Sequence, residues 1–494
     1  MRARAQDVIL ALDQGSSSSR ALVFDAKGRV IARAQRAVKT FHLREGWTEH
    51  DPAELARSLE AALDEVLAKL PASARVIAAG LACQRSTVVF WDRATLKPVS
   101  RAPSWMDGRA AAVVAGLADR QAQAHARTGL YLTPYYSAPK MRWFLDHDER
   151  VRALAQTGRL AATPVSTFLI ARLTKGVVIA ADPTMAQRTL LMGLDTLAWD
   201  DEMLGAFGLA RDLLPEIRPT AGDWGVIERG GRKIPLLACV GDQQAAAVGM
   251  GARTRSSAIA NYGTGAFLLA NTGFEARRIP GLLTTVGWQT RDTAPVFFQE
   301  GTVHAAGTSF EWLQSLGLMK GASGIDAAFR RSTHRVFALP AIGGLGAPRW
   351  DYTTKTTWFG LTSKTSPSDL VRATAEGLCF LLSDIASAMR AGGIEIKSAR
   401  IAGGLSRSDE MMAFQADMLE IPLERQRERE ATALGAASLA AEAAGAPYAL
   451  SMTDAPVEKI FPPRMTAADA ARLRDMWTRF VSAQAALSRA ISLT

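Results

Sequence analysis

Two loops of small polar residues, each set between apolar stretches, are the parts of this sequence best suited to hold an anion. The first follows Asp13 in "ALDQGSSSSRALVFD" (11–25), and the second lies in "AIANYGTGAFLLANTG" (258–273). Backbone N–H groups and hydroxyls in such turns can donate to phosphate oxygens. Taken alone, the first loop is better explained as the turn of a β-hairpin, and it matches neither the Walker loop nor G-x-G-x-x-G. The second loop, about half a chain length later, indicates a duplication and favours a pair of phosphate-binding turns.

A carboxylate that could act as a general base stands near the middle of the chain. Asp242 follows the apolar run "IPLLACV" (234–240) at a Gly-Asp turn. An aspartate in such a place more often only forms the turn. A carboxylate within hydrogen-bond reach of a hydroxyl can instead accept its proton. The local sequence leaves both roles open, and the six histidines form no metal-ligand spacing.

The segments that must position these residues alternate between strand and helix patterns. A helix is predicted after Asp51, which suits the N-cap, with Pro52 at its first position and apolar residues along one face. The other predicted elements are strands at 8–13, 20–25, 29–38, 76–84 and 398–404, and helices at 369–393 and 409–421. Strands in a meander followed by a helix and another strand predict a layered α/β domain.

Length, composition and charge limit the class of protein. A chain of 494 residues with 48% apolar and 21% charged residues is expected to form two large globular domains. Three distant cysteines, no cleavable leader and no apolar run long enough to span a membrane predict a cytoplasmic protein with buried thiols. The net charge of +10 is spread along the chain without an aromatic-interleaved basic motif, so no nucleic-acid partner is predicted. The densest charged run, at 423–430, alternates in sign and is interpreted as a solvated segment.

Two α/β halves that each begin with a strand, a phosphate-sized turn and a strand resemble the superfamily of sugar kinases, actin and Hsp70. The resemblance implies an α/β fold of two duplicated ribonuclease H-like domains with an interdomain cleft. The expected domains are 1–250, with the acceptor substrate and the first phosphate loop, and 251–494, with the nucleotide-binding site. In that architecture the two turns hold the phosphates of a nucleotide from opposite walls of the cleft.

Motifs along most of the chain are similar to those of the FGGY family of carbohydrate kinases, and within it to the members that phosphorylate glycerol. The motifs are "GWTEHDP" (46–52), "YYSAPKMRWFLDH" (135–147), "GDQQAAAVG" (241–249), "GLGAPRWD" (344–351), "AGGLSRSD" (402–409), "TALGAA" (432–437) and the two loops above. The stretch at 135–147 fits the first family signature, with Ser137, Lys140 and Trp143 in place. The resemblance implies an ATP-dependent kinase that uses Mg²⁺, with Asp242 as the catalytic base.

The same resemblance assigns the nucleotide and metal contacts. Asp13 would help to hold Mg²⁺ through water, since this ion keeps part of its hydration shell. The residues expected to contact the nucleotide are Ser16, Ser17 and Arg20 on the first wall, Gly263 and Thr264 on the second, and Gly307, Thr308, Gly403, Gly404 and Ser408 around the pocket.

The acceptor pocket departs from the pattern of the glycerol-binding members at one position. Ser86 stands where those members carry a glutamate. The other expected substrate contacts match and are Arg85, Trp105, Tyr135, Asp242, Gln243 and Phe267. The segment "SWMDGRA" (104–110) is closer to the W-x-D-x-R pattern of the family's ketose kinases, and it adds Asp107 and Arg109 as substrate or supporting groups. A serine has a shorter reach than a glutamate and no charge, which predicts either a larger or differently oxidised acceptor, or a water that bridges to glycerol.

The predicted function is therefore ATP-dependent phosphorylation of a hydroxyl of a small polyol, with glycerol or a glycerol-like polyol favoured. One alternative is a xylulokinase-like kinase of ketoses or other sugars. Another is a non-catalytic nucleotide-dependent clamp, which would have no use for a base such as Asp242. A small polyol or sugar is the expected partner, a membrane is not, and a homo-oligomer is possible.

Overall fold

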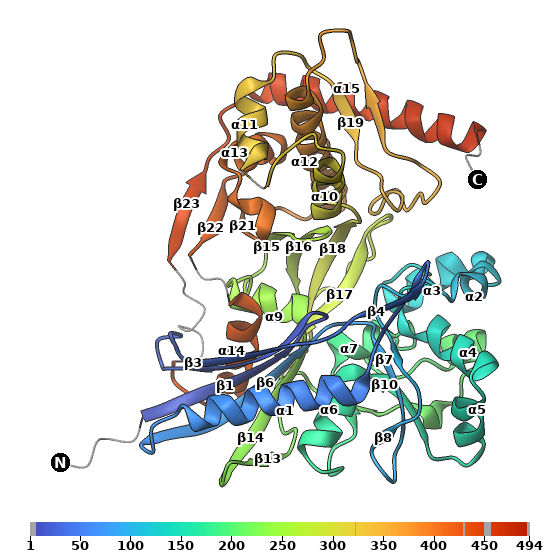
Figure 1. The fold of residues 1–494 in the computed structure, drawn as a ribbon, viewed down its shortest axis with the longest axis vertical. Helices are drawn as coiled ribbons and strands as arrows, with labels where there is room; N and C mark the ends of the chain where they lie inside the picture. The colour runs from blue at the N-terminus through green and yellow to red at the C-terminus, as the bar shows by residue number, and fades with distance from the viewer. Residues whose placement is uncertain (1–5, 322, 428–429, 449–455, 492–494) are drawn as a thin grey trace.

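The computed structural model describes residues 6–321, 323–427, 430–448 and 456–491, and two large sheets dominate these residues (Figure 1). The first sheet has the order β13 (Val226–Arg229), β14 (Arg232–Gly241), β6 (Ala74–Cys83), β1 (Gln6–Gln14), β2 (Ser18–Phe24), β3 (Val30–Ala37). The second has the order β17 (Leu283–Trp288), β18 (Val296–Val303), β16 (Ala266–Gly273), β15 (Ser257–Tyr262), β21 (Ser398–Ala402), β22 (Leu423–Gln426), β23 (Val457–Phe461).

The two sheets repeat one topology. In the first, β1 is antiparallel to β2 and β2 to β3, while β6 is parallel to both β1 and β14. In the second, β15, β16, β18, β21 and β22 take the places of β1, β2, β3, β6 and β14 with the same directions. The duplication predicted from the two loops is confirmed by this repeated strand order.

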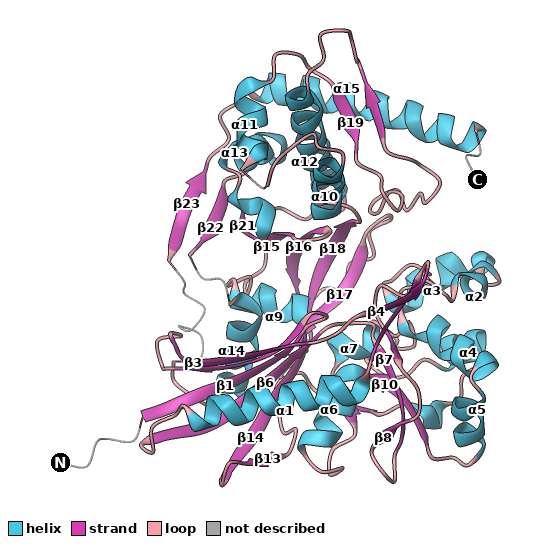
Figure 2. Ribbon diagram, viewed as in Figure 1, coloured by secondary structure: helices cyan, strands magenta, loops and turns pink. Residues whose placement is uncertain are grey.

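Helices cover the sheets and fill the space beside them (Figure 2). They are α1 (Pro52–Ala68), α2 (Ala111–Ala115), α3 (Gln121–Thr128), α4 (Ser137–His147), α5 (Glu149–Gln156), α6 (Val165–Leu173), α7 (Pro183–Gln187), α8 (Asp201–Phe207), α9 (Asp242–Gly249), α10 (Gly307–Ser315), α11 (Gly324–Arg331), α12 (Pro367–Ala391), α13 (Asp409–Leu419), α14 (Ala431–Ala443) and α15 (Ala467–Ala490). Short strands form smaller sheets from β4 (Phe41–Arg44), β5 (Trp47–His50) and β9 (Ala102–Pro103), from β7 (Val88–Asp92), β8 (Lys97–Pro98) and β10 (Leu160–Pro164), from β11 (Ala180–Ala181) and β12 (Glu216–Ile217), and from β19 (Phe337–Leu339) and β20 (Thr357–Phe359).

Helix α1 forms for the reasons seen in the sequence. The Asp51 carboxylate accepts a hydrogen bond of 2.9 Å from the backbone N–H of Ala53, so it caps one of the free donors of the first turn. The apolar face of α1 is buried with β1, β2 and β6 in one hydrophobic cluster. The predicted helices at 369–393 and 409–421 are likewise confirmed as α12 and α13.

Helices α9 and α14 pack so closely that glycine is required where they cross. A Cβ atom on Gly435 of α14 would lie 1.8 Å from the carbonyl oxygen of Ala245 in α9. Residues of both helices share a buried cluster with β1 and β6 of the first sheet and with β15 and β16 of the second. Helix α14 comes from the second half of the chain but packs against the first sheet. The predicted domain boundary at residue 250 separates the strands of the two sheets but does not account for the position of this helix, so it remains a prediction.

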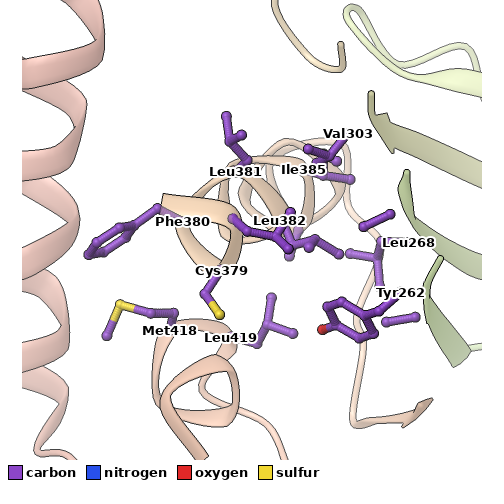
Figure 3. Packing of buried hydrophobic residues seen from close by; sticks show 14 of the residues in the cluster. Tyr262, Leu268, Val303, Cys379, Phe380, Leu381, Leu382, Ile385, Met418 and Leu419 are labelled. Carbon is purple, nitrogen blue, oxygen red and sulfur yellow. The ribbon is translucent and has the colours of Figure 1, made fainter. Parts of the chain in front are cut away.

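The second sheet carries its own core on the face turned toward α12 and α13. Figure 3 shows Leu382 and Ile385 of α12 directed toward Leu268 and Val303 of the strands, with Leu419 of α13 beside them. These side chains are no more than 3% exposed. The core fixes the ends of β15 and β21, from which the second loop and the 403–404 turn emerge.

One interpretation of the sequence is wrong. The run at 423–430 is not a solvated segment: residues 423–426 form β22 inside the second sheet, while 428–429 lie outside the described residues. Arg425 is buried there because Asp409 Oδ1, at 2.8 Å, and Glu458 Oε1, at 3.4 Å, compensate its charge. Within the described residues, every helix is too short or too polar to cross a membrane.

Candidate active site

Parallel strands of the first sheet bring three charged side chains to one edge. Asp13 near the end of β1 is level with Ala82 of β6, and Gly241 at the end of β14 is level with Cys83. Asp242 therefore begins α9 beside the turn in which Arg85 follows β6. The carboxyl ends of parallel strands are where such folds place their ligands.

The first loop is a tight turn tied to the neighbouring strand. The N–H of Gly15 donates to the carbonyl of Ser18 at 3.0 Å, and the Ser16 hydroxyl donates to Gln84 Oε1 at 3.2 Å. The loop therefore consists of small residues whose hydroxyl groups can form hydrogen bonds with a phosphate.

Asp13 is a buried carboxylate that Arg20 contacts directly. The guanidinium of Arg20 also donates to Glu430 Oε2 at 2.6 Å. Burial raises the pKa of Asp13 to about 6, with Arg20 lowering it and the nearby Asp242 raising it. Among the described residues, no cluster of three His, Cys, Asp or Glu side chains forms a complete metal site. A cation that prefers oxygen ligands and takes most of them from water and phosphate would bind here with Asp13 as the single carboxylate of its site.

Arg85 is held between carboxylates from both sheets. Its Nε lies 3.7 Å from Asp242 Oδ1, and its Nη1 lies 3.5 Å from Glu300 Oε2 of β18 in the second sheet. The guanidinium also donates to Gln243 Oε1. Glu300 is paired as well with Arg188, which is buried and donates to the Tyr136 hydroxyl at 3.3 Å. Burial would raise the pKa of Glu300, but the two arginines hold it below its ordinary value.

Asp242 is partly exposed and has a raised pKa. Its side chain is 36% exposed, while Glu300 is 1% exposed. The surrounding protein desolvates the carboxylate and raises the pKa of Asp242, although Arg85 and the N–H of Gln243 oppose this shift. A raised pKa makes the ionised form of a carboxylate a stronger proton acceptor.

Aromatic side chains lie next to these groups. Trp105 and Tyr135 are 38% and 42% exposed, so both rings are accessible to a ligand. The indole Nε1 of Trp105 donates to the Ser16 hydroxyl at 2.8 Å, so the aromatic group and the first loop are in contact. Phe267 comes from the second sheet, where it is half-buried on β16 opposite Asn261.

Ser86 has an unusual backbone conformation. Its φ is +65°, in the left-handed region that costs energy for a residue with a Cβ. Its hydroxyl donates to the carbonyl of Arg188 at 3.4 Å, and its own carbonyl accepts from the Ser137 hydroxyl and the Lys140 ammonium. The serine is thus fixed by contacts on several sides of the site.

Asp107 and Arg109 support the site rather than face a ligand. Arg109 donates to both Asp107 and Glu49 at 2.7 Å and lies 3.9 Å from the Trp47 ring centre. Asp107 also accepts from the N–H of Thr48 at 2.8 Å. The side chain of Arg109 is 2% exposed and that of Asp107 is 0% exposed. Of the two predicted roles, contact with the substrate and support of the site, this burial favours support.

The second loop is assembled in a different way. The N–H of Gly307, at the start of α10, donates to the carbonyl of Gly263 at 2.9 Å, and the Thr308 hydroxyl donates to the Thr264 carbonyl at 3.5 Å. Gly403 has φ +94° and lies so close to the loop that a Cβ would be 2.3 Å from the carbonyl of Tyr262. The loop, the α10 N-terminus and the 403–404 turn are therefore brought together.

The remaining predicted nucleotide contacts are Gly404 and Ser408, in and after the 403–404 turn, and Ser17 in the first loop. Gly404 begins a short turn of 3₁₀ helix that leads to Ser408. The Ser408 hydroxyl donates to Asp326 and accepts from the N–H of Met411, so it serves as the N-cap of α13. Ser17 is exposed in the first loop, where its carbonyl accepts from the N–H of Val38 at 2.9 Å.

Sequence reasoning missed the roles of Gln84, Arg188 and Glu300. Gln84 joins the first loop to the acceptor side, since it accepts from both Ser16 and the Thr87 hydroxyl. Glu300 is the one charged residue of β18, whose sequence is VFFQEGTV, and that contrast was the available signal. Arg188 gives no comparable local signal, because its partner is far away in the sequence.

The fold agrees with comparisons to known proteins. The model of the FGGY family of carbohydrate kinases matches with its N-terminal domain at residues 8–249 and its C-terminal domain at 258–444. The chain belongs to the FGGY family of carbohydrate kinases, which confirms the predicted class of kinase and the predicted fold.

Individual relatives are glycerol kinases. That of Thermus brockianus is 40% identical over 486 residues, covering 96% of this chain and 97% of the relative. That of Rhodospirillum centenum is 40% identical over 448 residues, covering 88% and 89%. Among solved structures, Plasmodium falciparum glycerol kinase with ADP has a TM-score of 0.90 at 29% identity, covering 98% and 99% of the two chains. A xyloylose kinase from Brucella ovis has a TM-score of 0.88 at 23% identity, covering 97% and 100%, and shares the fold.

Proposed function

We propose that this protein transfers the γ-phosphoryl group of ATP to a hydroxyl of a small polyol, glycerol or a close analogue. The observation that supports this most is the position of Asp242. It is partly exposed, has a raised pKa, and lies at the strand edge that also carries the first loop and Arg85. A nucleotide-dependent clamp would need the loops but not a base aimed at a hydroxyl.

Asp242 would accept the proton of the acceptor hydroxyl as its oxygen attacks the γ-phosphorus. A polyol hydroxyl is a poor nucleophile, and a positioned base typically contributes about 10² to 10⁴ in rate. Arg85 would hold neighbouring hydroxyls by donating hydrogen bonds, while Glu300 and Gln243 keep its guanidinium in place. Trp105 and Tyr135 would cover the carbon skeleton of the acceptor.

The phosphates would lie between the two loops. Backbone N–H groups of residues 16–17 and 264 are suited to bind the phosphate oxygens, together with Arg20. Asp13 would hold Mg²⁺ through water, and the ion, when bound, neutralises charge on the transferred phosphoryl group. The nucleoside would extend toward Gly307 and the 403–404 turn, which pack on the second loop.

The identity of the acceptor depends on Ser86. The serine hydroxyl donates to the Arg188 carbonyl and carries no charge, so a hydrogen bond that it accepts from a substrate hydroxyl is weaker than one to a glutamate carboxylate. The ketose alternative drew on Asp107 and Arg109, which are buried in protein contacts and do not offer free groups to a sugar.

A turnover panel tests the proposal. ADP release is measured with ATP, Mg²⁺ and each of glycerol, erythritol, dihydroxyacetone, erythrulose and common ketoses. The proposal predicts that at least one small polyol raises ADP release far above the acceptor-free rate. Stimulation by a ketose alone would favour the sugar-kinase alternative, and no stimulation by any acceptor would favour the clamp.

A further inference from the structure

Lys140 is a fully buried lysine whose ammonium contacts three backbone carbonyls. Its Nζ lies 2.8 Å from the carbonyl oxygens of Ser86, Ser104 and Tyr135, and the residue is 0% exposed. Any two of these oxygens are therefore within twice that distance of each other. Among the described residues, no carboxylate lies within ion-pair distance of this ammonium.

Each of the three carbonyls belongs to a different segment of the acceptor side. Ser86 follows Arg85 directly, Ser104 immediately precedes Trp105, and Tyr135 is itself one of the exposed aromatic residues. Apart from Asp242 and Gln243, the acceptor contacts expected in the first half of the chain lie in these three segments. Lys140 therefore contacts the backbone of each of them.

Burial of this ammonium destabilises the folded state. Burial lowers the pKa of Lys140 to about 7, with Asp107 raising it and Arg109 lowering it. Lys140 also lies in the first turn of α4, whose N-terminal dipole disfavours a positive charge. An ammonium has three N–H donors and a neutral amine only two, so the three carbonyl contacts require the charged form.

A second donor acts at the most strained of the three positions. The Ser137 hydroxyl, also on α4, donates to the Ser86 carbonyl at 3.3 Å. Ser86 has φ +65°, a conformation that persists only where surrounding contacts enforce it. The start of α4 thus supplies two donors to the carbonyl of the residue that distinguishes this pocket.

We propose that Lys140 is the positioning residue of the acceptor pocket: its ammonium binds the carbonyls of Ser86, Ser104 and Tyr135 and so fixes Arg85, Trp105 and Tyr135 relative to one another. Lys140 does not touch the acceptor in this account. The proposal rests on the proposed function, because it assumes that these residues bind the acceptor.

The test compares Lys140→Met with Lys69→Met. Methionine has a similar length but donates no hydrogen bond. Lys69 is a matched control, since its exposed ammonium also donates to a backbone carbonyl, that of Arg33, at 2.8 Å. KM and kcat are measured for ATP and, separately, for the best acceptor of the panel, with glycerol measured alongside.

A positioning role predicts that Lys140→Met raises KM for the acceptor about tenfold or more while KM for ATP stays within about twofold. Lys69→Met should leave both unchanged. A KM for the acceptor within about threefold of wild type, or equal rises in both KM values, would overturn the proposal. If Lys140→Met does not fold, Lys140→Gln takes its place, and failure of both variants to fold would show that the ammonium serves folding and would also overturn it.

The two proposals fail in different ways. If wild type shows no acceptor-stimulated ADP release with any compound of the panel, the proposed function is wrong and Lys140 has no acceptor pocket to position. If wild type is active and Lys140→Met matches it, the function stands and the positioning role is wrong.

Discussion

The Nε atom of Arg85 lies 3.7 Å from Oδ1 of Asp242. This distance allows both groups to reach the same hydroxyl-bearing ligand from neighbouring strand ends, one as a donor and one as a proton acceptor. The other side of the same guanidinium contacts Glu300, so a residue of the second sheet helps to set the geometry of a pocket built mainly on the first.

Replacing Asp242 with asparagine should separate chemistry from nucleotide binding. Asp242→Asn keeps the shape of the side chain but cannot accept a proton, so kcat with the preferred acceptor should fall by about 10² or more. ATP affinity, measured by calorimetry, should change little because the loops bind the phosphates. Asp201→Asn is the control, since Asp201 is highly exposed and, among the described residues, forms an ion pair with Arg211 alone. A variant that keeps more than about half of the wild-type kcat would remove Asp242 from the mechanism.

Ser86→Glu should move the acceptor preference toward glycerol. The new carboxylate would lie beside Arg85, and a hydrogen bond to a charged group contributes about 1.5 to 3 kcal/mol, or roughly 10 to 150-fold in relative kcat/KM. Desolvation of the carboxylate favours the lower end of this range. The measurement is kcat/KM for glycerol and for the preferred acceptor in both proteins. If wild type already prefers glycerol strongly, an altered acceptor is ruled out. If the variant shows no shift in acceptor preference, Ser86 does not determine the specificity, and residues 104–110 become the candidates.

Glu300→Gln should destabilise the protein and loosen Arg85. Glu300 is the buried counter-charge of Arg85 and Arg188, and removing one member of such a network typically costs about 3 to 5 kcal/mol. Unfolding in denaturant measures the loss. Glu65→Gln is a suitable comparison, because Glu65 also pairs with two cations, Arg36 and Lys69, but at the surface. Equal and small losses in both variants would show that the Glu300 network contributes little.

Asp369 should give the protein an acid-sensitive component of stability. Burial alone would raise its pKa, but hydrogen bonds from Ser366, His334 and Ser332 hold the pKa well below its ordinary value. The unfolded chain then binds the proton more readily, so this stabilisation is present above about pH 5 and is lost as pH falls through about 4 and below.

The measurement for Asp369 is the free energy of unfolding of wild type and Asp369→Asn across this range. We expect a deficit of about 2 kcal/mol for the variant at pH 7 that shrinks in acid. Asp475→Asn, at an exposed pair with Arg479 on α15, should show almost no deficit at any pH. A deficit for Asp369→Asn that does not depend on pH would contradict the assignment.

Features that depend on residues close together in the sequence could be predicted from the sequence alone. The capping pattern at Asp51 predicted the start of α1, and the repeat of strand, small-residue turn and strand predicted two sheets of one topology. Contacts between distant segments could not be predicted in this way. Arg188 and Glu300 are joined only once the two sheets meet, and the contacts of Lys140 depend on three loops folding around it. The alternating charges at 423–430 suggested solvent exposure, but strand pairing and ion pairs bury Arg425.

The central claim is that phosphate passes from ATP to a polyol hydroxyl at Asp242, and an isotope experiment tests it most directly. ATP labelled with ¹⁸O in its terminal phosphoryl group is incubated with the protein, Mg²⁺ and the best acceptor, and the products are identified by mass spectrometry. The account predicts a polyol phosphate that carries the labelled terminal oxygens and an unlabelled ester oxygen, formed by wild type and nearly absent with Asp242→Asn. Label found only in inorganic phosphate, at a rate that the acceptor does not change, would contradict it.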